Sequence, residues 1–291
     1  MKILLIGHSI IDRFEGDENS LPKPGGIYYS ALGLLSVLKS SDEIFLLTSW
    51  NQKSFPLFEK VYSNVNLDFV IQVQSLPEVI LKTSGEGERE EEYKNLSIKL
   101  ENKQIIDWNV FDGILVNMIT GSDISLDQLQ MMKRNFKGLI YFDVHTLSRG
   151  IDSNMQRKFR PILNASLWLK NVNIVQANEN EVRTLDGSID EEKCALNICN
   201  QGPEVLVITK GNAGAQLYSK FGNNMNSIFV KGEKVKSVNK VGCGDIFGAI
   251  FFYSYISTGN LAFSLERANK AGAVAASTAN LTELSKMNLN D

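Results

Sequence analysis

The sequence has few of the residues that cross-link small secreted proteins or bind soft metals. Its 291 residues include three cysteines (Cys194, Cys199 and Cys243), two histidines and no Cys-x-x-Cys pair. An odd number of cysteines without paired spacing argues against a disulfide framework and favours a reducing compartment. We therefore expect a cytoplasmic protein, and nothing in this composition supports a soft-metal site.

The sequence also lacks long hydrophobic runs and a strong charge imbalance. No apolar run approaches the roughly 18 to 20 residues that a membrane helix needs. The first apolar stretch, residues 1–7, turns polar at His8 and is too short for a secretory signal. A net charge of −3 gives no reason to expect nucleic acid or an anionic membrane as a partner. The 43% hydrophobic content is sufficient for a large buried core.

Short apolar runs alternate with amphipathic stretches along most of the chain. Continuous apolar runs, typical of strands buried on both faces, lie at 2–7, 43–48, 113–117, 139–143, 173–176 and 205–209. Helical patterns lie near 26–39, 125–136, 156–170, 191–200, 243–257 and 261–279. This alternation predicts an α/β fold, a three-layer αβα sandwich with a mostly parallel central sheet. Ligands of such sheets bind at the carboxyl ends of the strands.

Two stretches interrupt the alternation. Residues 13–24 form a polar connection with two prolines, and residues 67–100 hold strand-like segments without a helix between them. These segments are 67–73, 79–83 and 92–99, with a hairpin turn expected at Gly85-Glu86-Gly87 and an acidic, solvated run at 88–92. We predict a single domain, residues 1–291, that carries a small antiparallel β lid.

The most informative segment is the turn Gly242-Cys243-Gly244-Asp245, which follows a strand pattern at 233–238 and opens an apolar helix. Backbone N–H groups at a helix N-terminus face a field equivalent to roughly half a positive charge, which suits a phosphoryl group. Asp245 lies in the first turn and could accept a proton from an attacking hydroxyl. These four residues alone are equally compatible with a capped junction in which the acid only satisfies N–H groups.

Four further motifs accompany the turn. Gly7 and Asp12 are spaced as Gly-x(4)-Asp, Pro24-Gly25-Gly26 opens a helix, Asn178 and Glu181 form Asn-x-x-Glu, and Thr209-Lys210-Gly211-Asn212-Ala213-Gly214 follows a strand. In this order the five motifs resemble those of the ribokinase-like (PfkB-type) carbohydrate kinase family, and the resemblance covers essentially the whole chain.

The resemblance implies an ATP-dependent kinase that transfers the γ-phosphoryl group to a hydroxyl of a small sugar or polyol, in a monomer or homodimer. It implies that Asp245 is the catalytic base and that the amides of Gly242, Cys243 and Gly244 form an anion hole. The acceptor would be bound by Asp12, Gly25, Gly26 and Ser30. The nucleotide would be bound by Asn178, Thr209, Gly211, Gly214 and Asn269, and Mg²⁺ would be organised by Asn178 and Glu181.

Each motif also has a structural alternative when it is considered alone. Asn178 and Glu181 could be a helix-capping pair, Asp12 a cap, and the Pro-Gly-Gly segment a plain turn. His145 and Arg149 follow the strand at 139–143, where they could contact substrate and phosphate or simply pack on the surface.

Two positions depart from the family pattern. Ser30 stands where the family usually has Asn, which alters any contact with the acceptor. Asn239 stands where the family has an acid that often helps to bind a monovalent cation, which leaves potassium dependence open. A nucleoside kinase of the same fold and a non-catalytic nucleotide-binding sensor are therefore alternatives. A dinucleotide-dependent oxidoreductase has little support, because the first strand is not followed by Gly-x-Gly-x-x-Gly.

Overall fold

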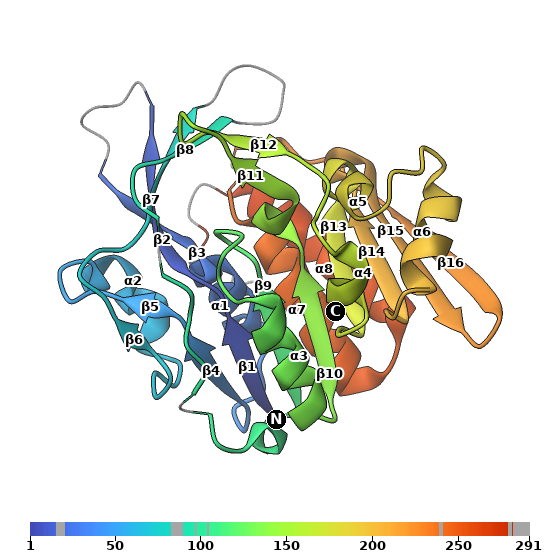
Figure 1. Ribbon diagram of the computed structural model, residues 1–291, viewed down its shortest axis with the longest axis horizontal. Helices are drawn as coiled ribbons and strands as arrows, with labels where there is room; N and C mark the ends of the chain where they lie inside the picture. Colours follow the sequence, from blue (N-terminus) through green and yellow to red (C-terminus); the bar gives the residue numbers. More distant parts are fainter. Residues whose placement is uncertain are drawn as a thin grey trace.

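An eight-stranded sheet forms the centre of the molecule (Figure 1). The structure, a computed structural model, describes residues 1–15, 21–82, 90–96, 98–103, 105–238, 241–278 and 281. In spatial order the strands are β16 (Asn224–Lys231), β15 (Gly214–Phe221), β14 (Val205–Thr209), β13 (Ile174–Asn178), β10 (Leu139–Asp143), β9 (Gly113–Asn117), β1 (Lys2–Ile6) and β4 (Glu43–Leu47). The strands from β14 to β4 run parallel, and β15 and β16 run antiparallel. All six predicted strands are present, with ends within two residues of the prediction.

The parallel strands are apolar throughout because helices cover both faces of the sheet. On β1, Ile3 and Leu5 pack into the core on one face, whereas Leu4 and Ile6 pack into the core on the other, and all four are fully buried. Alternate residues of the remaining parallel strands divide in the same way between the two cores. A continuous apolar run is therefore the expected sequence of such a strand.

Two layers of helices complete the sandwich. One core contains residues of α1 (Ile27–Leu35), α2 (Phe55–Tyr62), α7 (Cys243–Thr258) and α8 (Leu261–Ser277). The other contains residues of α3 (Leu126–Asn135), α4 (Ala165–Leu169), α5 (Glu179–Leu185) and α6 (Glu191–Cys199), the layer that faces the viewer in Figure 1. The predicted three-layer αβα fold is thus confirmed. None of the helices in the described ranges is long and apolar enough to cross a membrane.

A smaller four-stranded sheet lies beyond the carboxyl ends of the central strands (Figure 1). Its order is β3 (Lys23–Gly26), β2 (Ser9–Phe14), β7 (Glu78–Lys82) and β8 (Glu90–Tyr93). Beside it lies the hairpin of β11 (Arg149–Ile151) and β12 (Arg157–Phe159). The sheet is mixed rather than purely antiparallel, because β2 and β7 run parallel. That this sheet acts as a lid on a single domain stays a prediction.

Some boundaries predicted around the small sheet were wrong. Residues 67–73 contribute β6 (Ile71–Gln72), which pairs with β5 (Ser49–Trp50) instead of joining the small sheet. The strand expected at 92–99 is β8 alone and ends at Tyr93. The predicted turn at 85–87, part of the acidic run and part of segment 13–24 lie outside the described residues.

Two other predicted elements differ in the structure. The helix expected at 156–170 is confined to α4, because Pro161 cannot donate a backbone hydrogen bond and Asn164 adopts a left-handed conformation (φ 56°) just before the helix. The strand expected at 233–238 is an extended segment that pairs with no described strand. It lies along α8 instead, and Val238 N donates to Ala276 O at 2.8 Å.

A fully buried ion pair anchors the end of β1. His8 Nδ1 lies 2.9 Å from Asp123 Oδ1, and His8 Nε2 lies 2.8 Å from the carbonyl oxygen of Ile98. Burial by itself raises the pKa of Asp123, but the charge and hydrogen bonds of His8 and the amide of Thr120 lower it below its ordinary value.

This lowered pKa predicts a specific loss of stability in acid. A carboxylate whose pKa is lower in the folded state stabilises the fold above its ordinary pKa, and that contribution disappears as the pH falls below about 4. We expect Asp123→Asn to reduce the free energy of unfolding by about 3 kcal/mol at pH 7. Between pH 5 and pH 3, we expect this free energy to fall less in the variant than in the parent. Urea unfolding across this range measures both effects, with the exposed Asp68→Asn as control. Equal pH slopes in the two variants would contradict the assignment.

Candidate active site

The first turn of α7 starts at a position that only glycine fits. Gly242 has a φ of 78°, and a Cβ built on it would lie 2.3 Å from the ring of Tyr29. Gly244 is exposed, and a Cβ there would meet only Gln176 Nε2, at 3.9 Å. Gly242 also has no side chain that could cap the helix. The amides at this helix start therefore face an opening.

Asp245, in the same turn, is half-buried and held by the central sheet. Asn117, the last residue of β9, donates through Nδ2 to Asp245 Oδ1 at 2.6 Å and to Ser30 Oγ at 3.2 Å. The buried Oδ1 of Asn117 has no hydrogen-bond partner within the described part of the chain. Such an orphan is costly, which indicates that the amide serves to fix Asp245. A polar residue at the end of a buried apolar strand was the sequence signal for Asn117, and our sequence analysis missed it.

A second carboxyl group lies close behind the turn. Asp143 ends β10 and is buried, and Gln176 Nε2 donates to its Oδ2 at 2.8 Å and to Gly244 O at 3.2 Å. Burial raises the pKa of Asp143 well above its ordinary value, and the negative charges of Glu181 and Asp245 raise it further. A cation bound at this edge of the sheet would relieve that repulsion.

The predicted metal pair forms a capping box in the structure. Asn178 Oδ1 accepts hydrogen bonds from the amides of Asn180 and Glu181, both at 2.9 Å, and Glu181 Oε2 accepts one from Asn178 N at 2.9 Å. Glu181 Oε1 lies 3.7 Å from Arg149 Nη2. Within the described ranges, no three or more His, Cys, Asp or Glu side chains are grouped as a metal cage. These residues fit a Mg²⁺ ion that keeps mainly water and phosphate ligands, with Glu181 as its acidic neighbour.

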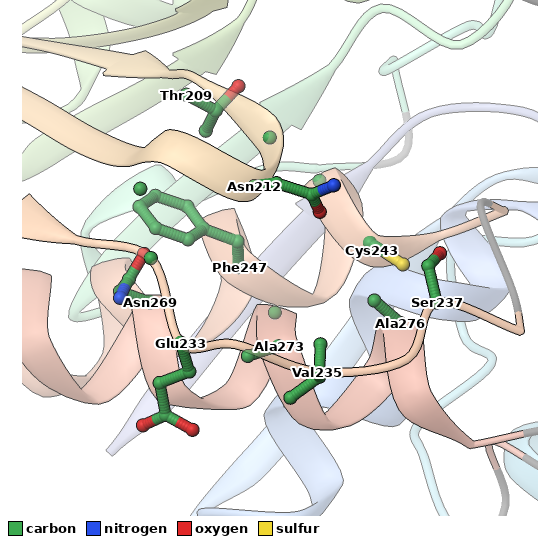
Figure 2. A pocket seen from close by; sticks show the side chains of 15 residues that line it. Thr209, Asn212, Glu233, Val235, Ser237, Cys243, Phe247, Asn269, Ala273 and Ala276 are labelled. Atoms are coloured by element: carbon green, nitrogen blue, oxygen red, sulfur yellow. The ribbon is translucent and has the colours of Figure 1, made fainter. Parts of the chain in front are cut away.

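A cavity of about 370 Å³ lies on one side of the helix start (Figure 2). Four residues predicted to bind nucleotide line it together with Cys243 and Gly244, namely Thr209, Gly211, Gly214 and Asn269. Gly211 lies in the turn η3 (Gly211–Ala213) that joins β14 to β15. Figure 2 shows Phe247, Val235, Ala273 and Ala276 around the space. Asn178 does not line this cavity, and the Asn269 amide donates to Lys231 O at 3.0 Å.

A much smaller cavity, about 30 Å³, lies on the other side of the same turn. Its lining includes Asp12, Gly26, Tyr29, Glu91, His145, Arg157, Gly242 and Asp245. Gly25 packs directly against the carboxylate of Asp12, because a Cβ on Gly25 would lie 2.5 Å from Asp12 Oδ2. Ser30 is fully buried and does not reach this cavity.

The structure thus brings most of the predicted site residues together around one helix start. Asp12 and Asp245 line the same small cavity, and the predicted nucleotide residues other than Asn178 line the large one. His145 lines the small cavity, whereas Arg149 lies beside Glu181 with its guanidinium 4.6 Å from the ring centroid of Phe159. The prediction of a solvated acidic run at 88–92 was wrong for Glu91, which is buried, and Arg157 was not anticipated from the sequence. Asn239, the position tied to potassium dependence, lies outside the described residues.

Comparisons with known proteins agree with this architecture. The family model described as pfkB family carbohydrate kinase matches residues 146–287. No curated protein sequence matches the chain. The resemblance to the ribokinase-like (PfkB-type) family is confirmed by this match and by the folds of similar solved structures.

Several solved structures superpose on nearly the whole chain. A pyrophosphate-dependent kinase in the ribokinase family, solved as a sulfate complex, has a TM-score of 0.80 at 13% identity, covering 99% of this chain and 100% of the other. Ribokinase from Thermotoga maritima has a TM-score of 0.74 at 17% identity, covering 97% and 95%. Arabidopsis thaliana ribokinase complexed with ribose and ATP has a TM-score of 0.72 at 15% identity, covering 98% of each chain. At these identities the likeness shows the fold alone.

Two alanine substitutions in the turn should differ in their effect on stability. We expect Gly242→Ala to lose about 2 kcal/mol or more of stability, because the methyl group meets Tyr29 and the backbone is left-handed. Gly244→Ala should fold within about 0.5 kcal/mol of the parent, because its methyl group would meet only Gln176 Nε2, at 3.9 Å. Urea unfolding measures both variants. Equal stability of the variants would show that the turn tolerates a side chain at 242.

Proposed function

We propose that this ribokinase-like (PfkB-type) chain is a kinase that transfers the γ-phosphoryl group of ATP to a hydroxyl of a small sugar or polyol. One observation carries the proposal. The open start of α7 separates a large cavity with apolar walls from a small one lined by carboxylates, and Asp245 lies on the small side. Phosphoryl transfer needs a donor and an acceptor on opposite sides of such an anion-binding turn.

The large cavity supports ATP as the donor. Its volume of about 370 Å³ and the apolar side chains of Val235, Phe247 and Ala273 suit a nucleoside. The pyrophosphate-dependent neighbour raises inorganic pyrophosphate as a second candidate. Pyrophosphate has no apolar part and calls for cationic ligands, but none of the described residues that line this cavity is Lys or Arg, and Glu233 is acidic. We therefore favour ATP.

The small cavity supports an acceptor rich in hydroxyl groups. Carboxylates of Asp12 and Asp245 can accept hydrogen bonds from several hydroxyls, and they reject analogues that lack them. Asn117 engages Asp245 Oδ1, so Oδ2 is the oxygen that takes the acceptor proton. The amides of Gly242, Cys243 and Gly244 stabilise the transferring group. When bound near Glu181, with Asn178 fixing that side chain, Mg²⁺ supplies positive charge to the donor phosphates.

Replacement of the base tests the proposed chemistry. We expect Asp245→Asn to lower kcat by about 10³-fold, within the range for loss of a general base, while ATP–Mg²⁺ affinity changes less than about threefold. Steady-state kinetics and calorimetric titration measure the two quantities. Asp127→Asn, in the first turn of α3, is the control and should leave both unchanged. Near-normal turnover of Asp245→Asn would remove the base assignment.

A panel of donors and acceptors tests the reaction itself. We expect ATP rather than pyrophosphate to phosphorylate one or more neutral sugars or polyols, detected by ³¹P NMR of the product. Transfer to nucleosides alone would establish the nucleoside kinase instead. Transfer from pyrophosphate alone would overturn the donor assignment. Binding of ATP without transfer to any acceptor would support the sensor.

A further inference from the structure

A buried ion pair forms one wall of the small cavity and has no part in the chemistry described so far. Glu91 lies on β8 of the small sheet, Arg157 lies on β12, and their side chains are 4% and 3% exposed. Arg157 Nη1 donates to Glu91 Oε2. Both residues line the cavity that contains Asp12 and Asp245.

The surroundings hold this pair in a fixed orientation. Arg157 Nη2 donates to Ile119 O at 3.1 Å, and its guanidinium lies 4.2 Å from the ring centroid of Tyr93. Backbone pairing fixes the two segments to each other, because Tyr93 N donates to Met155 O at 3.0 Å and Glu92 forms an antiparallel bridge with Gln156. The charged wall is therefore held in place by contacts within the protein.

Stability alone does not account for such a pair. Removing two charges from water offsets most of their attraction, and well-packed apolar residues often serve a fold as well or better. A preorganised carboxylate and guanidinium instead offer an acceptor and a planar set of donors to hydroxyl groups. The location beside Asp12 and Asp245 gives these groups a ligand to recognise.

The charges around the cavity define the ligand's chemistry. Asp12, Glu91 and Asp245 are acidic, and Arg157 is the one Lys or Arg among its described lining residues. Glu91 offsets the charge of Arg157, so the wall repels an anionic acceptor. Resting on the proposed function, we infer that Glu91 and Arg157 bind the acceptor and restrict it to an uncharged polyhydroxy compound.

Charge-neutral replacement of Glu91 provides the sharpest test. The probes are the best neutral substrate of the panel and its carboxylate analogue, in which one hydroxymethyl or aldehyde carbon is oxidised to the acid. We expect Glu91→Gln to raise KM for the neutral acceptor about tenfold, with KM for ATP within twofold. The ratio of kcat/KM for the neutral over the anionic acceptor should fall at least tenfold, because Arg157 then faces the anion without Glu91. Arg157→Lys, which keeps the charge but loses the planar fork, should weaken the neutral acceptor about tenfold without that gain for the anion.

The matched control is the ion pair between Arg13 and Glu78, which joins β2 to β7 in the same small sheet outside the cavity. Glu78→Gln should leave both KM values and the acceptor ratio unchanged. If Glu91→Gln does not fold, shown by loss of the ATP–Mg²⁺ thermal shift, Arg157→Lys decides the question.

The outcomes separate this inference from the proposed function. An active parent whose Glu91 and Arg157 variants match Glu78→Gln in KM and acceptor ratio would overturn the inference and leave the kinase assignment intact. A parent that phosphorylates nothing would overturn the proposed function. Calorimetric titration of the polyol panel would then test whether Glu91 and Arg157 bind the acceptor. The inference is wrong if no polyol binds, or if the variants bind polyols as tightly as the parent does.

Discussion

The hydrogen bond between Asn117 Nδ2 and Asp245 Oδ1 joins the end of the central sheet to the first turn of α7. It connects residues 128 positions apart in the chain, and the same amide nitrogen also contacts Ser30 on α1. Two helices and a strand therefore meet at one side chain. Because the side-chain oxygen of Asn117 is left without a hydrogen-bond partner in the described structure, the orientation of Asp245 comes with an unsatisfied buried acceptor.

Negative charge gathers at the same edge of the sheet. Asp143 is buried next to Glu181 and Asp245, and these neighbours add to the effect of burial in raising its pKa. Arg149 lies 3.7 Å from Glu181, and the start of α7 adds the partial positive charge of its amides. The edge thus suits a ligand that brings its own cation, which is how nucleoside triphosphates are commonly bound.

The fold could be predicted from the sequence where strands are buried on both faces. Strands such as β1 and β9 are covered on both faces, so their composition alone identifies them. The segment 233–238 was mistaken for a strand because an apolar alternation does not specify a partner, and here the partner is α8. The helix at 156–170 was misplaced because periodicity was given more weight than Pro161.

Residues of the candidate site could be predicted from the sequence only where they belong to a short local motif. Gly242 and Asp245 belong to one short turn, so their proximity follows from the chain itself. Glu91 and Arg157 are 66 positions apart and meet only through the pairing of β8 with the hairpin that contains β12. No local pattern encodes a contact of that kind.

The two cavities share the start of α7 but draw their remaining walls from different parts of the chain. The larger takes Thr209, Gly211, Asn212 and Gly214 from one segment and further residues from the segments 232–237 and 269–276, none of them lysine. The smaller takes residues of β2, β3, β7, β8 and β12, with Tyr29, Ile119, His145 and Val241. Changes in β7, β8 and β12 can therefore alter the smaller cavity without altering the lining of the larger one.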